Sequence, residues 1–324
     1  MQDYPPEICG SQAESEAGGK PAAVTDERVP LARAVELFLL EKKTEGVKGG
    51  VLKKYERELA RLNSFLENRS KFFPSDITKE LLTEYRATWD DVYPSSATRQ
   101  QVQARVRRFL RFCHDAAWME RLPRLSPIKV DVPPTMPLST KEYKELLGNV
   151  PEQFSGEKAK RVRALIQLMR HSGLAIRDAV TLERSELLHD AKKKTYRVAT
   201  ARQKTGTSVS VPLPPKIAAE ILAVRNGHAY FFWNGSGLET SVVTNWQHDL
   251  RTLFRATFGQ DTHFTPHSLR DTAAVEWLSA GIPLEEVSKL LGHTSVKTTE
   301  KSYAPWVVAR QDRLDSLVVA TWKK

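Results

Sequence analysis

Cysteine is nearly absent from this sequence of 324 residues. Only Cys9 and Cys113 are present, so the chain has neither a disulfide framework nor a cysteine-rich metal site. A reducing, cytoplasmic setting is the expectation that follows. Long apolar runs are also missing, since no stretch of about 18 apolar residues occurs, and we therefore expect no membrane-spanning helix and no membrane partner.

Positive charge is what the sequence has in excess. The formal net charge is +10, and it is unevenly spread, with −4 in residues 1–28, +6 in residues 29–135 and +8 in residues 136–324. Two basic segments suit a polyanionic partner, because each Lys or Arg that contacts a phosphate releases counterions. Charge alone fits an ordinary basic protein equally well, so the choice depends on the motifs below.

The first part of the chain divides into three segments by composition. Residues 1–28 lack apolar periodicity and are expected to form a disordered leader. Apolar residues at three- and four-residue spacing predict an all-α domain over residues 29–122, with helices from Leu31 and over residues 51–66, 78–89 and 96–118. Prolines concentrated in residues 123–138 indicate an extended linker.

Residues 139–324 are predicted to form a second, mostly helical domain. Ser139 is placed to cap a helix over residues 141–147. Alternating residues predict two strands, 195–200 and 208–212, joined by a turn that contains Gln203-Lys204-Thr205-Gly206. Further helices are expected over residues 158–170, 178–188, 215–225, 241–258, 267–280, 284–291 and 295–301. The fold class is therefore mainly α with a small β-sheet.

Four residues near the C-terminus form a set suited to phosphoryl transfer. His267 and Arg270 are three positions apart at a predicted helix start, so both project from one face. His293 follows Gly292 at a helix junction, and Tyr303 comes ten residues later. In such a set the phenol is the nucleophile, and the guanidinium stabilises charge on the phosphorus-bound oxygens. Each residue taken singly is more often structural, and only the combination favours chemistry.

These residues stand in motifs that resemble the tyrosine recombinase (phage integrase) family. The family's H-x-L-R, L-G-H and T-T motifs match His267-Ser268-Leu269-Arg270, Leu291-Gly292-His293 and Thr298-Thr299, and its nucleophile matches Tyr303. Its β-hairpin lysine matches Lys204 in Lys204-Thr205-Gly206, before Val211-Pro212-Leu213. The resemblance covers roughly residues 29–324, and its C-terminal motifs are very specific.

The resemblance implies a reaction that uses no metal, no ATP and no other cofactor. Tyr303 would attack the scissile phosphate, form a 3′-phosphotyrosyl bond and release a 5′-hydroxyl, with Lys204 as the general acid for that oxygen. Arg270 and His293 would stabilise the transition state, and His267 would assist proton transfer or charge stabilisation. The covalent intermediate conserves the phosphodiester energy, so the strand can be rejoined.

The resemblance also implies partners and a location. Residues 29–122 would be a core-binding (SAM-like) domain that clamps double-stranded DNA, and residues 139–324 the mixed α/β catalytic domain. A homotetramer on two DNA sites, associated with the nucleoid in the cytoplasm, is the expected assembly. The apolar tail (Val307, Val308, Leu314, Leu317 and Val318) fits docking on a neighbouring subunit, and it fits packing within its own chain equally well.

One position departs from the family pattern. The family's first arginine follows T-G-L directly, whereas this chain has Ala175 after Ser172-Gly173-Leu174, and Asp178 falls at the family's acidic position. Arg177, roughly 200° further round a regular helix, is the expected working residue. Arg170 is a second candidate, and a site without this arginine is the third interpretation. One extra residue between His293 and Tyr303 is expected to be absorbed by a loop at Ser302.

Two other functions stay open at this point. A non-catalytic, sequence-specific DNA-binding protein on the same scaffold is favoured by Ala175 and opposed by Lys204, Arg270, His293 and Tyr303. A relaxing topoisomerase of the IB type would use the same covalent chemistry without strand exchange. The separate core-binding module and the apolar tail favour the recombinase over this second alternative. The target site does not follow from the sequence, because base readout depends on side-chain geometry in the grooves.

Overall fold

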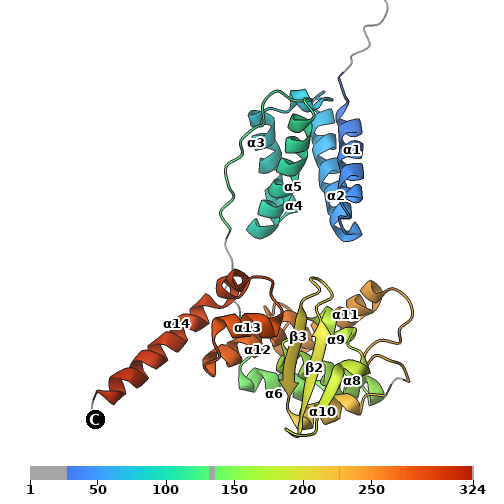
Figure 1. Ribbon diagram of the computed structural model, residues 1–324. Helices are drawn as coiled ribbons and strands as arrows, with labels where there is room; N and C mark the ends of the chain where they lie inside the picture. The colour runs from blue at the N-terminus through green and yellow to red at the C-terminus, as the bar shows by residue number, and fades with distance from the viewer. Residues whose placement is uncertain (1–27, 131–135, 226, 323–324) are drawn as a thin grey trace, which may run out of the picture. The chain divides into compact units, whose positions relative to one another are not determined.

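The computed structural model describes residues 28–130, 136–225 and 227–322, and the chain divides into two compact units between residues 132 and 133. Each unit has a hydrophobic core of its own (Figure 1). The leader predicted over residues 1–28 lies outside the described residues except for Arg28. Within the described ranges, no helix is both long and apolar enough to span a bilayer.

The first unit is a helical bundle with an aromatic core. Phe38 is fully buried and packs edge-on against Tyr55, Phe109 and Phe112, at ring-centroid distances of 5.3, 5.6 and 5.4 Å. Edge-to-face pairs of this kind add to the free energy gained by burial. The helices are α1 Leu31–Thr44, α2 Gly49–Glu67, α3 Lys79–Ala87, α4 Trp89–Val92 and α5 Ser96–Asp115.

The helices predicted for this unit are confirmed, with small differences at their ends. Thr78 caps α3, because its hydroxyl accepts a hydrogen bond from the amide of Leu81. Helix α5 ends at Asp115 instead of the predicted Trp118, and Ala117 follows with a positive φ of 59°. A residue in the left-handed region is a common way to end a helix.

The arginines of α5 divide between the interior of the unit and its surface. Arg105 makes hydrogen bonds of 2.5 and 2.6 Å to the two carboxylate oxygens of the buried Glu58. Arg108 is exposed but donates to the Tyr55 hydroxyl at 3.0 Å, and Arg107 and Arg111 are also exposed. A buried carboxylate needs a charged partner to offset its desolvation. Part of the positive charge of α5 therefore serves the fold of the unit itself.

The second unit contains a three-stranded antiparallel sheet in the order β1-β2-β3 (Figure 1). The strands are β1 Leu187–Asp190, β2 Thr195–Ala201 and β3 Ser208–Leu213. Val198 in the middle strand is opposite Leu187 on one side and Val211 on the other. Alternate residues of β3 (Val209, Val211 and Leu213) are buried, and α13 packs beside this strand (Figure 1).

One helix predicted for this unit is wrong. The sequence pattern predicts a helix over residues 178–188, but α9 covers only Ile176–Val180 and β1 begins at Leu187. The Thr181 hydroxyl donates a hydrogen bond to the carbonyl of Arg177 where α9 ends. Leu187 then finds its backbone partner in β2, opposite Val198. Pairing with a strand further along the chain thus overrides a local helical pattern.

Helices from distant parts of the sequence meet around the site. Helix α8 ends at Ser172, and Gly173 after it has a left-handed φ of 64°. A Cβ atom there would lie 3.0 Å from side-chain atoms of Leu291 and Trp277, so glycine permits the close approach. The remaining helices are α6 Thr140–Gly148, α7 Val150–Gln153, α8 Gly156–Ser172, α10 Pro215–Leu222, α11 Glu239–Phe258, α12 Pro266–Ser279, α13 Leu284–Leu291 and α14 Val296–Thr321.

The loop predicted at Ser302 is wrong, because Ser302 lies in helix α14. It runs from Val296 to Thr321 as one helix, so both Ser302 and Tyr303 are helical. The Tyr303 ring is only 2% exposed and packs in a cluster with Leu278 of α12 and Leu291 of α13. The longer spacing after His293 is therefore taken up by the helix, and hydrophobic packing against two other helices fixes the position of the tyrosine.

We predict that Phe38→Ala destabilises the first unit by about 3–5 kcal/mol, the usual range for emptying a buried aromatic site. Hydrogen exchange of the α2 and α5 amides, measured on the full chain by mass spectrometry, reports the free energy of local opening. Phe72→Ala, at a position that is 50% exposed, is the matched control and changes it by less than about 0.5 kcal/mol. Equal effects of the two variants would contradict the core assignment.

Candidate active site

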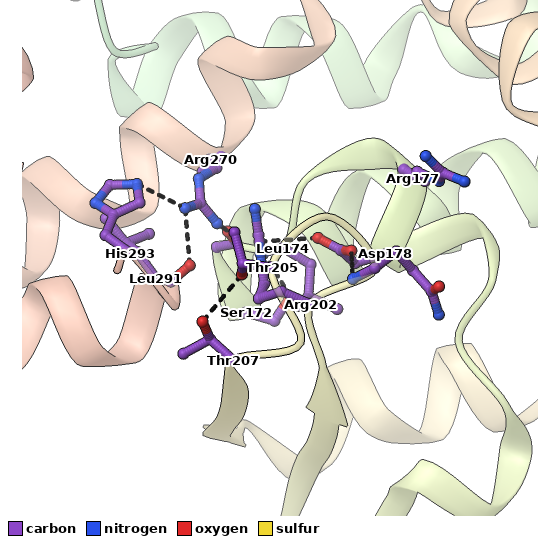
Figure 2. A network of polar contacts seen from close by, with 12 residues as sticks. Ser172, Leu174, Arg177, Asp178, Arg202, Thr205, Thr207, Arg270, Leu291 and His293 are labelled. Carbon is purple, nitrogen blue, oxygen red and sulfur yellow. Dashed lines mark hydrogen bonds and ion pairs between the residues drawn. The ribbon is translucent and has the colours of Figure 1, made fainter. Parts of the chain in front are cut away.

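Arg270 joins three separate segments of the second unit through its buried guanidinium. The side chain projects from the second turn of α12, and the residue is 2% exposed. Nη1 donates to the carbonyl of Gly173 at 2.5 Å, and Nη2 donates to the carbonyl of Leu291 at 2.8 Å. Nη2 also lies 2.9 Å from Nε2 of His293 (Figure 2). The ends of α8 and α13 are thus tied to α12 by one side chain.

The guanidinium of Arg270 keeps its charge at neutral pH despite this burial. Burial, and after it the neighbouring charge of Arg202, lower the pKa of Arg270 to about 10. That value is well above pH 7, so the group carries a full positive charge in a largely water-excluded place. Charge stabilisation is strongest in such surroundings.

The hydrogen bonds of His293 define its tautomer. A guanidinium only donates, so Nε2 of His293, at 2.9 Å from Arg270, must be the acceptor. Nδ1 then carries the proton and donates to the hydroxyl of the buried Thr299 at 2.7 Å. Burial, followed by the charges of Arg270 and Arg202, lowers the pKa of His293 to about 4. The imidazole is therefore neutral at pH 7, with its orientation fixed from both sides.

Tyr303 is held as a neutral phenol by a carboxylate next to Arg270. Its hydroxyl donates to Oδ1 of Asp271 at 2.7 Å. Burial raises the pKa of Tyr303, and the negative charge of Asp271 raises it further. Arg270 and Asp271 are consecutive residues of α12, so the nucleophile candidate is attached to the same helix turn as the buried guanidinium.

His267 and Lys204 lie on the exposed side of this group. The His267 side chain is 62% exposed, and its Nε2 is 3.6 Å from Oδ1 of Asp271, which therefore has both His267 and Tyr303 as neighbours. Lys204 is exposed in the turn between β2 and β3. The amides of Thr205 and Gly206 both donate to the carbonyl of Arg202, which shapes this turn.

The base of the β2–β3 hairpin is fixed by the buried Asp178. Its Oδ1 accepts a hydrogen bond of 2.9 Å from the amide of Gln203, and its Oδ2 lies 2.9 Å from Nη1 of Arg202. Both side chains of the ion pair are largely buried, at 12% exposure for Arg202 and 5% for Asp178. Figure 2 shows Arg202 between Asp178 and Arg270. This pair sets where the turn that carries Lys204 meets the body of the unit.

The two arginines expected to stand in for the residue at Ala175 lie elsewhere. Arg177 forms an ion pair with Glu239 and points away from Arg270 and His293 in Figure 2. Arg170 pairs with Glu276 and lies over the ring of Tyr143, 5.3 Å from its centroid. Each guanidinium thus has a carboxylate of its own. Their catalytic roles stay predictions that the geometry does not favour.

The structure thus brings together Arg270, His293, Tyr303 and His267, and it places Lys204 on the adjacent hairpin. Sequence reasoning missed three residues of this group (Arg202, Asp271 and Thr299). Two of them had signals, because Asp271 directly follows the H-x-L-R motif and Thr299 lies in the T-T pair. Arg202 had no signal of its own beyond its place next to Gln203, since its contact with Asp178 spans 24 positions of sequence.

The chemistry open to this cluster is attack by a phenol oxygen on an anionic group. A fixed guanidinium and an oriented imidazole surround the position where negative charge would develop, and a carboxylate is in contact with the phenol proton. These are the parts of nucleophilic catalysis with electrostatic stabilisation. Among the described residues, no group of three or more His, Cys, Asp or Glu side chains is placed to hold a metal ion.

Comparison with known families agrees with this geometry. The Phage integrase family matches residues 137–306, which is more than half of the chain and includes all the site residues named above. The chain belongs to the phage integrase family.

Individual relatives and solved structures extend the likeness beyond the matched segment. The chain is 29% identical over 279 residues to the tyrosine recombinase XerD of Mycobacterium tuberculosis, covering 79% of this chain and 87% of that protein. It is 26% identical over 278 residues to the tyrosine recombinase XerC of Chlamydia muridarum, covering 76% and 85%. A lambda integrase dimer bound to a COC′ core site matches with a TM-score of 0.67 at 16% identity, covering 85% of this chain and 95% of that chain. The structural match shows the fold.

We predict that the imidazole of His293 stays neutral down to about pH 5 and that Arg270→Gln raises its pKa, because a neighbouring positive charge is removed. NMR titration of the His293 ring measures this pKa in the wild-type chain and in Arg270→Gln. The signal is assigned as the one that is missing from the spectrum of His293→Gln. An ordinary value near 6.5 in the wild-type chain would contradict the buried, arginine-bonded imidazole.

The lowered pKa of His293 also gives the sign of a stability effect. Between about pH 6.5 and pH 4 the unfolded chain binds this proton and the folded chain does not, so the free energy of unfolding falls as the pH falls. His293→Gln removes this contribution. Its free energy of unfolding should therefore depend less steeply on pH in that window than that of the wild-type chain.

Proposed function

We propose that this chain is a site-specific tyrosine recombinase that cleaves and rejoins double-stranded DNA through Tyr303. One observation carries the proposal. The only phenol of the cluster, Tyr303, is bonded to Asp271, next to the buried Arg270–His293 pair, all within the segment that matches the family. Neither a general DNA-binding protein nor a structural protein needs a nucleophile beside a charged, water-excluded guanidinium.

The reaction begins with a neutral tyrosine. The Tyr303 oxygen attacks the scissile phosphorus and loses its proton to the nearest base, for which Asp271, with His267 beside it, is in place. A 3′-phosphotyrosyl bond forms, the bond to the 5′-oxygen breaks, and Lys204 donates the proton that this oxygen needs. The reverse sequence rejoins the strand, because the new ester conserves the energy of the old one.

Arg270 and His293 stabilise the charge that develops on the nonbridging oxygens during both steps. Their positions are fixed before any substrate arrives, since Arg270 is anchored to two backbone carbonyls and His293 to Thr299. Preorganised donors avoid the cost of reorganisation during the reaction. Arg177 has no part in this proposal, because Glu239 holds its guanidinium outside the cluster.

The charge of the chain supports DNA as the substrate and the first unit as a core-binding domain. Both segments that form the described units are basic, and Arg107 and Arg111 are exposed on α5, where they can contact phosphates. We place the domain boundaries at residues 29–122 and 139–324, with a linker between them. The enzyme would act in the cytoplasm, where it would associate with the nucleoid.

The tail supports assembly into a homotetramer on two DNA sites. Leu317 and Trp322 are 58% and 75% exposed at the end of α14, and Val318 and Val319 between them are also exposed. Apolar side chains of this kind gain free energy when a neighbouring subunit covers them. A related lambda integrase has been solved as a tetramer bound to a Holliday junction, with a TM-score of 0.64 at 16% identity.

We predict that the wild-type chain forms a denaturant-resistant covalent adduct with a nicked duplex and that Tyr303→Phe forms none. The duplexes are tiled across the DNA that flanks the coding sequence of the chain, and a nick beside the scissile phosphate traps the adduct because the short released strand diffuses away. Denaturing gel electrophoresis measures the adduct.

Two outcomes would contradict the recombinase and identify the alternative. Tight binding of the duplex with no adduct from the wild-type chain would favour a non-catalytic DNA-binding protein. Tyr303-dependent relaxation of supercoiled plasmid by monomers, without any recombinant product, would favour a topoisomerase.

A further inference from the structure

We propose that Arg202 is a catalytic residue, which supplies from the β2–β3 hairpin the second guanidinium that Ala175 cannot provide and binds a nonbridging oxygen of the scissile phosphate. This inference rests on the recombinase function proposed above and specifies the site further. It replaces Arg177, the residue that the sequence favoured, with one from a different element of the fold.

The path of the Arg202 side chain leads toward the site residues. Arg202 follows β2 directly, and its amide donates to the carbonyl of Thr207 across the hairpin. Its aliphatic carbons pass over Gly292, where an added Cβ atom would lie 2.7 Å from Cγ of Arg202. Gly292 is the residue before His293. The stem of Arg202 is therefore packed against the segment that presents the imidazole, and Figure 2 shows the side chain between Asp178 and Arg270.

The guanidinium of Arg202 has donors left for an anion. A guanidinium carries five N–H donors. Within the part of the chain that the structure describes, Arg202 makes one ion pair, from Nη1 to Asp178 at 2.9 Å, and its guanidinium makes no hydrogen bond. A structural arginine with 12% exposure normally satisfies more of its donors than this. The arrangement is the one expected of a group that is held from one side and awaits a ligand on the other.

The charges of Arg202 and Arg270 act on the same small region. After burial, the charge of Arg202 is the largest contribution that lowers the pKa of Arg270, and it also lowers the pKa of His293. Two like charges close together in a poorly solvated place repel each other, and such arrangements are concentrated at functional sites. A phosphate bound between them would relieve the repulsion, because its nonbridging oxygens carry the opposite charge.

The ion pair with Asp178 gives Arg202 a defined position, and the role of Asp178 is to hold the hairpin. Asp178 holds the hairpin twice, through the Arg202 guanidinium and through the amide of Gln203. Lys204 is two residues further along the same turn. One buried carboxylate therefore positions both the proposed phosphate-binding guanidinium and the proposed general acid, so the two would reach the phosphate together.

The experiment compares single-turnover rates of adduct formation on the nicked duplex that traps the wild-type chain. We expect Arg202→Ala to lower the rate by about 100-fold or more, the usual effect of removing one preorganised charge-stabilising donor, with duplex binding reduced far less. Arg177→Ala is the matched control, since it removes an arginine of the same unit whose guanidinium is paired with Glu239, and we expect a change of less than about threefold. Thermal unfolding of each variant checks that it folds, and Arg202→Lys, which keeps the charge beside Asp178, replaces Arg202→Ala if that variant is unfolded.

A second substrate separates catalysis from a structural role. A methylphosphonate at the scissile position replaces one charged nonbridging oxygen with a neutral methyl group, so a guanidinium that neutralises that oxygen is no longer needed. We expect the deficit of Arg202→Ala, or of Arg202→Lys, relative to the wild-type chain to shrink to less than about tenfold on this duplex. An equal deficit on both duplexes means a structural role and overturns the inference.

The outcomes distinguish this inference from the proposed function. A wild-type adduct that Tyr303→Phe abolishes and that Arg202→Ala leaves within threefold would refute the role of Arg202 and keep the recombinase. No wild-type adduct on any duplex would refute the recombinase and, with it, this inference.

Discussion

The active site depends on the burial of one guanidinium. Arg270 is bonded to the carbonyls of Gly173 and Leu291 and to the imidazole of His293, so segments about 100 residues apart in sequence converge on a single side chain. Removing it would leave two carbonyls and an imidazole without their donor in a dry interior, where unpaired polar groups are costly. The same bonds that stabilise the second unit therefore build the charged surface that a phosphate would meet, and fold and chemistry cannot be separated at this residue.

The site holds its proposed nucleophile in the protonated form. The Tyr303 hydroxyl donates a hydrogen bond to Asp271. Burial and the negative charge of this carboxylate raise the pKa of the phenol, so it stays protonated. The anion that attack requires is favoured only when positive charge and a proton acceptor are both near the oxygen. In the proposed reaction the phenol therefore gives up its proton only as its oxygen bonds to the phosphorus.

Local signals in the sequence predicted most of this architecture, and the failures have a common cause. Thr78 and Ser139 cap helices at the predicted positions, and the alternation of Val209, Val211 and Leu213 predicted a strand. The helix expected over residues 178–188 failed because Leu187 pairs with Val198, a contact that no local pattern encodes. Arg202 was missed for the same reason, since its neighbours Asp178 and Gly292 are distant in sequence. The motif residues were found because their types and spacing carry the chemistry directly.

The continuity of α14 has a mechanical consequence. Tyr303 and the exposed Leu317 belong to one helix with no break between them, and at about 1.5 Å per residue they are about 21 Å apart along its axis. One helix thus joins a segment packed against α12 and α13 to a segment whose apolar side chains are exposed. A subunit that covered the exposed end would therefore bind the same helix that carries the phenol, at a place remote from the cluster around Arg270.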